Sequence, residues 1–181
     1  GHGASSAFIT VLLKNLINRL RRNLKRQSSD DLLSPHKVID RINKELVEAK
    51  LGKHVRLFWG MIDLSTYSLS YSVAGQFPMP ILKNDKGVQY LNGCSQPAGL
   101  FATAEYSTYE IELGKTFELV AVSDGILEVM TQTNLAEKEA CLINWVEQGQ
   151  LTVENLETLL NFQDGKEIPD DITLLTLSRT E

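Results

Sequence analysis

The feature that most constrains the fold is an apolar run that ends in an acid and a glycine. The run extends from Phe117 to Val122 and is followed directly by Ser123, Asp124 and Gly125. Its last four residues are uncharged and apolar, which predicts a central β-strand covered on both faces. Glycine after a strand permits a sharp turn or the close approach of another backbone. The stretch therefore predicts a buried strand that carries Asp124 to its end.

Asp124 has two interpretations that this stretch alone leaves open. Aspartate is favoured at helix N-caps and in turns, because its carboxylate accepts hydrogen bonds from nearby backbone amides. It is also an oxygen ligand for a divalent cation if other acids reach the same place. Asp170 and Asp171 stand immediately before the last predicted strand, at 172–178. If that strand is the antiparallel neighbour of 117–122, the carboxylates converge in a way that suits Mg²⁺ or Mn²⁺.

Periodicity along the rest of the chain predicts an α+β fold, with mostly antiparallel strands between terminal groups of helices. Helices are expected over residues 4–26, from Pro35 to near Gly52 with Ser34 as the N-cap, over 135–146 and over 153–162. Strand pairs are expected between 57–62 and 67–73, between 79–83 and 88–91, and between 106–113 and 117–123. Gly114 and Lys115 would close the last of these hairpins.

The chain has 181 residues and is expected to form a single domain over residues 1–181. Its net charge of −5 argues against a nucleic-acid-binding protein, because phosphate contacts need a concentrated positive surface. Basic residues cluster at 19–26, at the end of the first predicted helix, where cations complement the helix dipole. We therefore expect this cluster to be a solvated helix end, and we expect no nucleic-acid partner.

The sequence carries no sign of a membrane or secretory location. No apolar run approaches the roughly 18 residues needed to cross a bilayer, and no signal-peptide pattern is present. Cys94 and Cys141 lie far apart and share no CxxC spacing, so reduced thiols are expected. The cysteines are isolated and the histidines show no paired spacing, so no zinc site is expected. We expect a cytoplasmic protein with no membrane partner.

Several short motifs occur together in a characteristic order. They are Gly-His-Gly-Ala at 1–4, Ser-Pro at 34–35, Asn43, and the segments 58–63, 71–75, 97–100, 123–125 and 170–173. In this order and spacing they resemble the SpoIIE/RsbU-like branch of the PP2C-type (PPM) serine/threonine phosphatases, along essentially the whole chain. Each motif alone is weak, and the specificity comes from the full set.

The resemblance implies a fold and a chemistry. Members of this branch fold as an αββα sandwich of mostly antiparallel sheets flanked by helices. They hold two Mn²⁺ or Mg²⁺ ions by aspartates at one end of the sandwich, and a water that bridges the metals attacks a phosphoserine or phosphothreonine. Two such ions lower the pKa of the water and neutralise the phosphoryl oxygens, so no nucleophilic side chain is required.

Carried over by position, the metal site would be formed by Asp124, Asp170 and Asp171. Asp170 is the expected ligand of the pair, and Asp171 stands where many relatives carry Asn, which favours a supporting role. Glu128 occupies a position that is often acidic in this branch, although a solvated helix residue is an equally good interpretation. Gln76 replaces a common histidine, and Ser123 replaces the usual threonine.

The remaining site residues implied by the resemblance are supporting ones. They are Gly125, Thr173, Gly1, His2 and Gly3. In this branch the Gly-His-Gly motif normally follows Asp-x-Ser or Asp-x-Thr, whose aspartate bridges the two metals. We therefore interpret the chain as a phosphatase domain truncated at its N-terminus and lacking its first strands. Weak metal binding and low activity are expected of such a fragment.

Two functional hypotheses remain at this stage. The first is a phosphatase that dephosphorylates a STAS-domain anti-sigma-factor antagonist in bacterial signalling, downstream of a receiver or other sensor domain in the full-length protein. The second is a binding module that keeps the fold without the chemistry and regulates a sigma-factor switch by protein–protein interaction. A purely structural interpretation, in which the acids serve as caps and turn formers, is the third and weakest.

Overall fold

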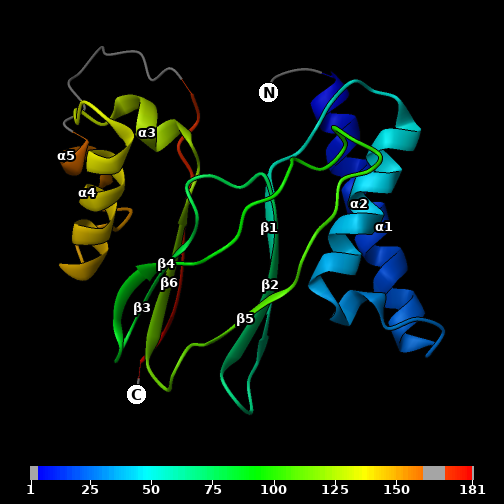
Figure 1. Ribbon diagram of the computed structural model, residues 1–181, viewed down its shortest axis with the longest axis horizontal. Helices are drawn as coiled ribbons and strands as arrows, with labels where there is room; N and C mark the ends of the chain where they lie inside the picture. Colours follow the sequence, from blue (N-terminus) through cyan, green and yellow to red (C-terminus); the bar gives the residue numbers. More distant parts are fainter. Residues whose placement is uncertain (1–3, 161–169, 181) are drawn as a thin grey trace. The chain divides into compact units, whose positions relative to one another are not determined.

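The computed structural model describes residues 4–160 and 170–180 (Figure 1). These residues form two compact units, each built from an antiparallel sheet and helices. Unit 1 comprises the chain up to Gln76 together with residues 93–112, and unit 2 comprises residues 77–92 and the chain from Leu113 onward. The α+β architecture with antiparallel sheets is the one predicted.

The sheet of unit 1 contains β1 (Leu57–Asp63), β2 (Ser68–Ala74) and β5 (Tyr109–Glu112), in the order β1-β2-β5. Both pairs are antiparallel, and the predicted β1–β2 hairpin is confirmed. Three rings from the three strands stack on one face. The ring centroids of Phe58 and Tyr71 are 5.1 Å apart, and those of Tyr71 and Tyr109 are 5.5 Å apart. Such cross-strand aromatic pairs fix the register of the sheet.

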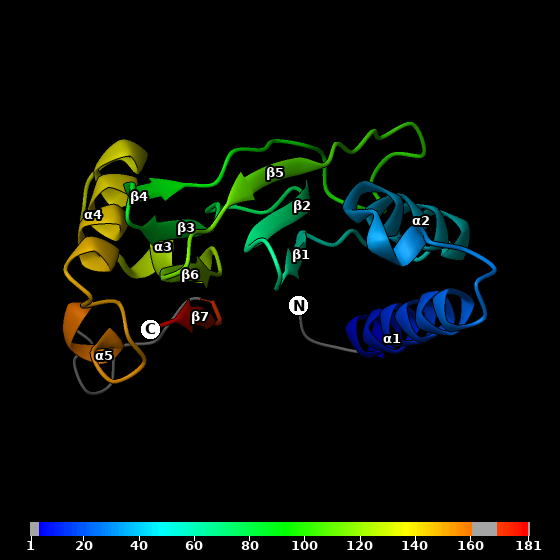
Figure 2. The same ribbon diagram turned by 90° about the horizontal axis from the view of Figure 1, so that it is seen from below.

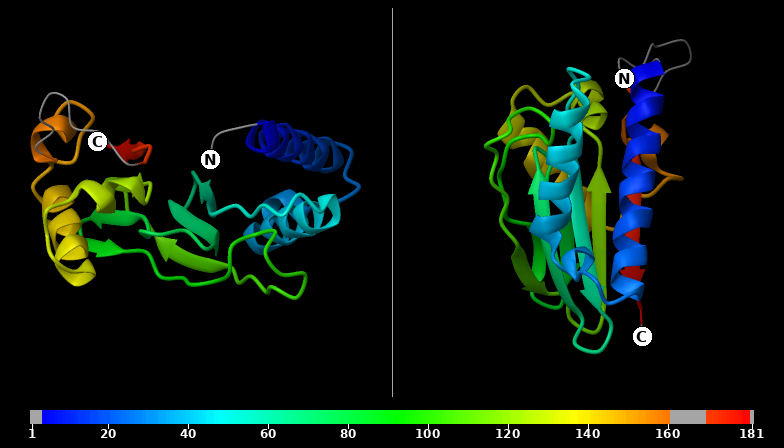
Figure 3. Two further views of the ribbon diagram at one scale, coloured as in Figure 1. Left: turned by 90° about the horizontal axis from the view of Figure 1, so that it is seen from above. Right: turned by 90° about the vertical axis from the view of Figure 1, so that its right-hand side faces the viewer.

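The other face of this sheet is covered by α1 (Ala4–Lys25) and α2 (Pro35–Ala49), joined through the short 3₁₀ helix η1 (Asp31–Leu33). Figure 3 shows the two long helices running antiparallel beside each other. The α2 helix begins at Pro35, whose ring presets a helical φ, and ends at Lys50 in a left-handed conformation with a φ of 49°. Ser34 holds the predicted N-cap place, but its hydroxyl does not bond an α2 amide. The buried core of unit 1 is formed by Ile9, Leu16, Leu20, Val38, Ile39, Ile42, Leu46, Ala74, Ala98 and Tyr106.

The sheet of unit 2 contains β3 (Ile81–Asn84), β4 (Gly87–Tyr90), β6 (Phe117–Val122) and β7 (Leu174–Arg179), in the order β4-β3-β6-β7. The β3–β4 hairpin is confirmed, and Lys86 N donates to the Asn84 side chain in its turn. The β6 strand is central, as predicted. Val120 and Val122 on one face are buried, whereas Leu119 and Ala121 on the other face are only half-buried.

The buried face of this sheet packs against α3 (Gly125–Val129), α4 (Leu135–Glu147) and α5 (Leu156–Leu159), as Figure 2 shows for α4. Hydrogen bonds tie the sheet to α4 near its middle and at its end. Tyr90 Oη donates to the Glu139 carbonyl at 3.0 Å, and Lys83 Nζ donates to the last carbonyls of α4 at 3.0 and 3.2 Å. The lysine is thereby placed where a cation complements the helix dipole.

Two predicted elements are confirmed only in part. The strand predicted at 106–113 does not pair with 117–123. Instead, β5 pairs with β2, and β6 pairs with β3 and β7. Leu113 is fully buried, and the Asn84 side chain donates to its carbonyl at 3.1 Å, so the chain leaves β5 instead of turning back along it.

The second difference concerns the helix predicted at 153–162, of which α5 confirms 156–159, while positions 161 and 162 lie outside the described residues. Val153 is 70% exposed and lies in a turn, and α5 begins only at Leu156 and spans four residues. The amide of Asn155 bonds the Thr152 side chain at 3.3 Å, which favours a local turn over an earlier helix start. Among the described residues no helix has the length and apolar character that a membrane span needs.

Candidate metal centre

The candidate site lies where β6 ends beside the start of β7. These strands are antiparallel neighbours, as the convergence of the acids requires, and Val122 pairs with Leu174. The backbone ladder continues one residue beyond the strands, because Ser123 N donates to the Thr173 carbonyl at 3.0 Å. Residues 123–125 and 170–173 are therefore brought together, although about fifty positions separate them in the sequence.

Gly125 shows how closely the two segments approach. A Cβ atom built on this buried glycine would lie 2.6 Å from the Asp171 carbonyl oxygen and 3.3 Å from that of Asp170. No side chain fits at this distance. The glycine is therefore required by contact between the start of α3 and the acidic turn, which is the close-approach alternative of the sequence prediction.

Asp124 occupies the N-cap place of α3 without capping it. Its backbone is helical, with φ −63° and ψ −24°, and its side chain bonds none of the helix amides. Capping residues normally have extended backbone and accept from an amide two or three positions on. The capping interpretation of this half-buried aspartate is therefore not supported.

Asp170 and Asp171 are exposed at the start of the last segment. The Asp171 amide donates to Asp170 Oδ1 at 2.8 Å, which fixes the orientation of the Asp170 carboxylate. The Asp171 carbonyl in turn accepts a hydrogen bond from Ser123 Oγ at 3.0 Å. Thr173 takes part through its backbone amide and carbonyl.

The side-chain atoms that could bind a metal ion at this end of unit 2 are carboxylate oxygens, the ligand type that Mg²⁺ and Mn²⁺ prefer. The Gly125 contact leaves the Asp170–Asp171 turn directly against the residue that follows Asp124. Within residues 4–160 and 170–180, however, no three His, Cys, Asp or Glu side chains gather closely enough to hold a metal ion. The ligand roles of Asp124, Asp170 and Asp171 therefore stay predictions.

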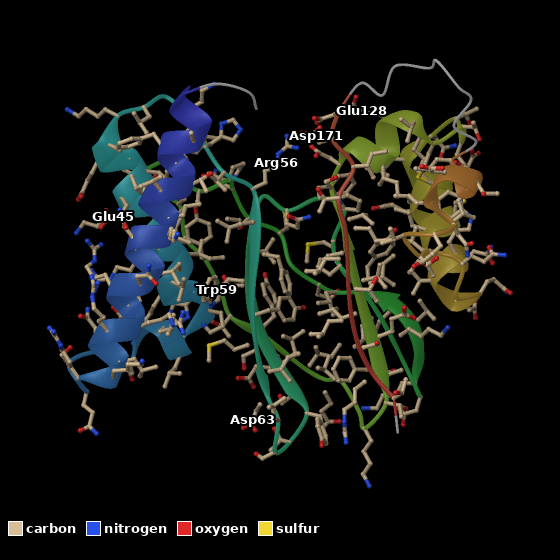
Figure 4. The ribbon with its side chains drawn as sticks, turned by 180° about the vertical axis from the view of Figure 1, so that it is seen from behind. Glu45, Arg56, Trp59, Asp63, Glu128 and Asp171 are labelled. Carbon is tan, nitrogen blue, oxygen red and sulfur yellow. The ribbon has the colours of Figure 1, made fainter. Side chains whose placement is uncertain are left out.

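The other predicted site residues divide into two groups. Gly1, His2 and Gly3 lie outside the described residues. Glu128 is exposed on α3, and Figure 4 shows it at the same end of unit 2 as Asp171. The sequence did not assign a role to the Ser123 hydroxyl, although Ser123 follows a strand directly and stands in a matched motif where threonine is usual.

The matched motifs of unit 1 have structural roles. Asn43 is buried in α2, where its Oδ1 accepts from Gly99 N at 2.7 Å and its Nδ2 donates to the Phe101 carbonyl at 3.0 Å. Gly75 follows β2 with a φ of +60° and lies against Pro97. These residues fix the 93–104 loop and bring no acid to it.

The chain is similar to known proteins in sequence family and in fold. The family model described as "Stage II sporulation protein E (SpoIIE)" matches residues 1–180. No curated protein sequence matches the chain. Among solved structures, the RsbU and RsbW domains of Rv1364c from Mycobacterium tuberculosis superpose with a TM-score of 0.73 at 20% identity, over 99% of this chain and 49% of theirs.

Two single-domain structures are similar as well. The SiaA-PP2C domain of Pseudomonas aeruginosa has a TM-score of 0.72 at 17% identity, over 99% of this chain and 72% of that one. The phosphatase domain of SpoIIE from Bacillus subtilis has a TM-score of 0.54 at 17% identity, over 98% and 74% respectively. The chain thus spans about half of the first structure and about three quarters of these two. The fold is that of the PP2C-type phosphatase domains among these structures, and the chain belongs to the SpoIIE family.

Proposed function

We propose that this chain is the catalytic part of a divalent-metal-dependent phosphoserine/phosphothreonine protein phosphatase. The observation that carries the proposal is the contact of Gly125 with the Asp170–Asp171 turn, which places acids from two distant segments at one end of unit 2. Family membership supports the same reaction class. A Bacillus subtilis SpoIIE phosphatase structure was presoaked with manganese, and an RsbX structure holds magnesium, which supports divalent metal use here.

In the proposed mechanism, Asp124 and Asp170 are the residues that would hold two Mn²⁺ or Mg²⁺ ions. When bound, such ions supply a water of lowered pKa and neutralise charge on the phosphoryl oxygens. The chain's own residues orient the acids. The Asp171 amide holds one oxygen of the Asp170 carboxylate, and Gly125 permits the approach of the turn that carries it. Asp171 supports this arrangement through its backbone.

The substrate and context are proposed from the chain's relatives. The chain is similar to a structure of RsbU and RsbW domains and to a structure from work on the bacterial stressosome, described as a modular system that controls secondary messenger signalling. They support a phosphorylated STAS-domain anti-sigma-factor antagonist as substrate. A cytoplasmic full-length protein with an upstream receiver or sensor domain suits this role. Release of phosphate from a phosphorylated STAS-domain protein would test the substrate directly.

The reaction is tested in the full-length protein by Mn²⁺-dependent hydrolysis of p-nitrophenyl phosphate. Asp124→Ala and Asp170→Ala are each expected to lower the rate by more than about 100-fold, because loss of a ligand exceeds loss of a residue that only supports one. Asp85→Ala is the matched control, since Asp85 is exposed in the β3–β4 turn at the other end of the sheet. Retained hydrolysis in both site variants would refute the proposed ligands.

A further inference from the structure

The Ser123 hydroxyl forms two hydrogen bonds to the segment that carries the acids. Its Oγ donates to the Asp171 carbonyl at 3.0 Å and accepts from the Thr173 amide at 2.8 Å. The backbone bond from Ser123 N to the Thr173 carbonyl, at 3.0 Å, completes the set. One residue at the end of β6 thus bonds both sides of Ile172, before the regular β6–β7 ladder begins at Leu174.

We infer that Ser123 is a positioning residue for the proposed metal centre, acting through its hydroxyl on the Asp170–Asp171 turn. This inference rests on the proposed function. The Asp171 carbonyl that accepts from Ser123 is the atom that would meet a Cβ at Gly125, 2.6 Å away. The hydroxyl therefore holds the turn against the residue next to Asp124. The Asp171 amide then fixes Asp170 Oδ1.

The chemistry of the position allows few side chains. The group must donate one hydrogen bond and accept another at the same atom, which a hydroxyl does and a methyl or an ammonium group does not. Threonine keeps this atom in place and adds only a methyl group to a half-buried site. Alanine removes both bonds and leaves the Thr173 amide without its partner. Ser123→Thr and Ser123→Ala are therefore expected to have different effects on the turn.

The test measures two quantities in the full-length protein. The first is the hydrogen-exchange protection of the Thr173 amide without metal, which reports the hydrogen bond from this amide to Ser123 Oγ. The second is the Mn²⁺ dissociation constant from calorimetry. Ser123→Ala is expected to lose the protection and to weaken Mn²⁺ binding by about 10- to 100-fold, the usual effect of removing a group that orients a ligand. Ser123→Thr is expected to retain both.

Thr133→Val is the control, because the Thr133 hydroxyl bonds Glu137 at the start of α4 and not the acidic turn. It is expected to leave both quantities unchanged. Unchanged Mn²⁺ affinity in Ser123→Ala would overturn the positioning role, and so would unchanged Thr173 protection. If the unaltered protein binds no Mn²⁺, the proposed function fails, and Thr173 exchange still decides whether the hydroxyl holds the turn.

Discussion

The end of β2 in unit 1 and the end of β6 in unit 2 are closed by the same two devices. At each end a glycine lies against a distant backbone segment, Pro97 facing Gly75 and Asp171 facing Gly125. At each end a serine hydroxyl also bonds a carbonyl across the gap, from Ser95 to Val73 and from Ser123 to Asp171.

The two ends differ in what the facing segment carries. In unit 1 it is the 93–104 loop, held by the buried Asn43 side chain, and it contributes packing. In unit 2 it is an exposed turn of two aspartates, which lies against the residue that follows Asp124. The way a strand end is closed therefore does not determine its chemistry. That chemistry depends on the residues that the closure brings together.

Among substitutions at the two strand ends, Gly75→Ala is expected to cause the largest loss of stability. The substitution combines a positive φ with a Cβ 2.7 Å from Pro97 Cγ, and should lower the free energy of unfolding by about 2–5 kcal/mol.

Gly125→Ala has the contact without the positive φ, and should cost about 1–3 kcal/mol. Denaturant unfolding measures both values.

Gly52→Ala is the matched control for Gly75, because Gly52 has nearly the same φ, +62°, with nothing within 4 Å of its Cβ position. It should cost only about 1–2 kcal/mol. Equal losses for Gly75→Ala and Gly52→Ala would show that the Pro97 contact is not tight.

Asn43→Ala tests the side chain that holds the unit 1 loop. It leaves the Gly99 amide and the Phe101 carbonyl without their partner, and should destabilise the protein by about 1–3 kcal/mol. The exposed Asn18→Ala on α1 is the control and should change stability by less than about 0.5 kcal/mol. A loss of stability no greater than that of the control would show that the Asn43 side chain does not hold the 93–104 loop.

Ser95→Ala is the unit 1 counterpart of the Ser123 substitution. Loss of its bond to the Val73 carbonyl should lower the free energy of unfolding by about 1 kcal/mol. Mn²⁺ affinity should stay unchanged, because the 93–104 loop brings no acidic residue to the end of β2. Weaker Mn²⁺ binding in Ser95→Ala would contradict the division of roles between the two strand ends.

The smallest effect concerns a charge contact between η1 and α2 in unit 1. Arg41 donates two hydrogen bonds to Asp31 at 2.9 and 3.1 Å, and these hold the pKa of Asp31 below its ordinary value of 3.8. A carboxylate with a lowered pKa stabilises the folded state above its unfolded pKa and loses that contribution as the pH falls.

Asp31→Asn should therefore cost less than about 1 kcal/mol at pH 7, since Arg41 is half exposed. The difference from the unaltered protein should shrink as the pH falls through 3.8 and below. Urea unfolding at several pH values measures it, with the exposed neighbour variant Asp30→Asn as control. A difference that grew toward low pH would reverse the sign of the assigned interaction.

Much of the fold could be predicted because its signals are local. The apolar spacing of α1 and α4, the Pro35 start of α2 and the turn residues at 84–87 all act within a few positions. The β5 pairing could not be predicted in this way. Tyr109 and Ile111 suit either partner by pattern, and the choice of β2 depends on cross-strand contacts with Tyr71 and Leu69.

The acids at the strand ends can be identified from the chain alone, and the order of its motifs indicates the phosphatase family. The contact of Gly125 with the Asp170–Asp171 turn and the hydrogen bond of the Ser123 hydroxyl to this turn are visible only in the folded chain. The physical reason is separation along the chain. Periodicity and turn chemistry are written in adjacent residues, whereas hydrogen bonds between residues 48 and 50 positions apart exist only once β6 and β7 have paired.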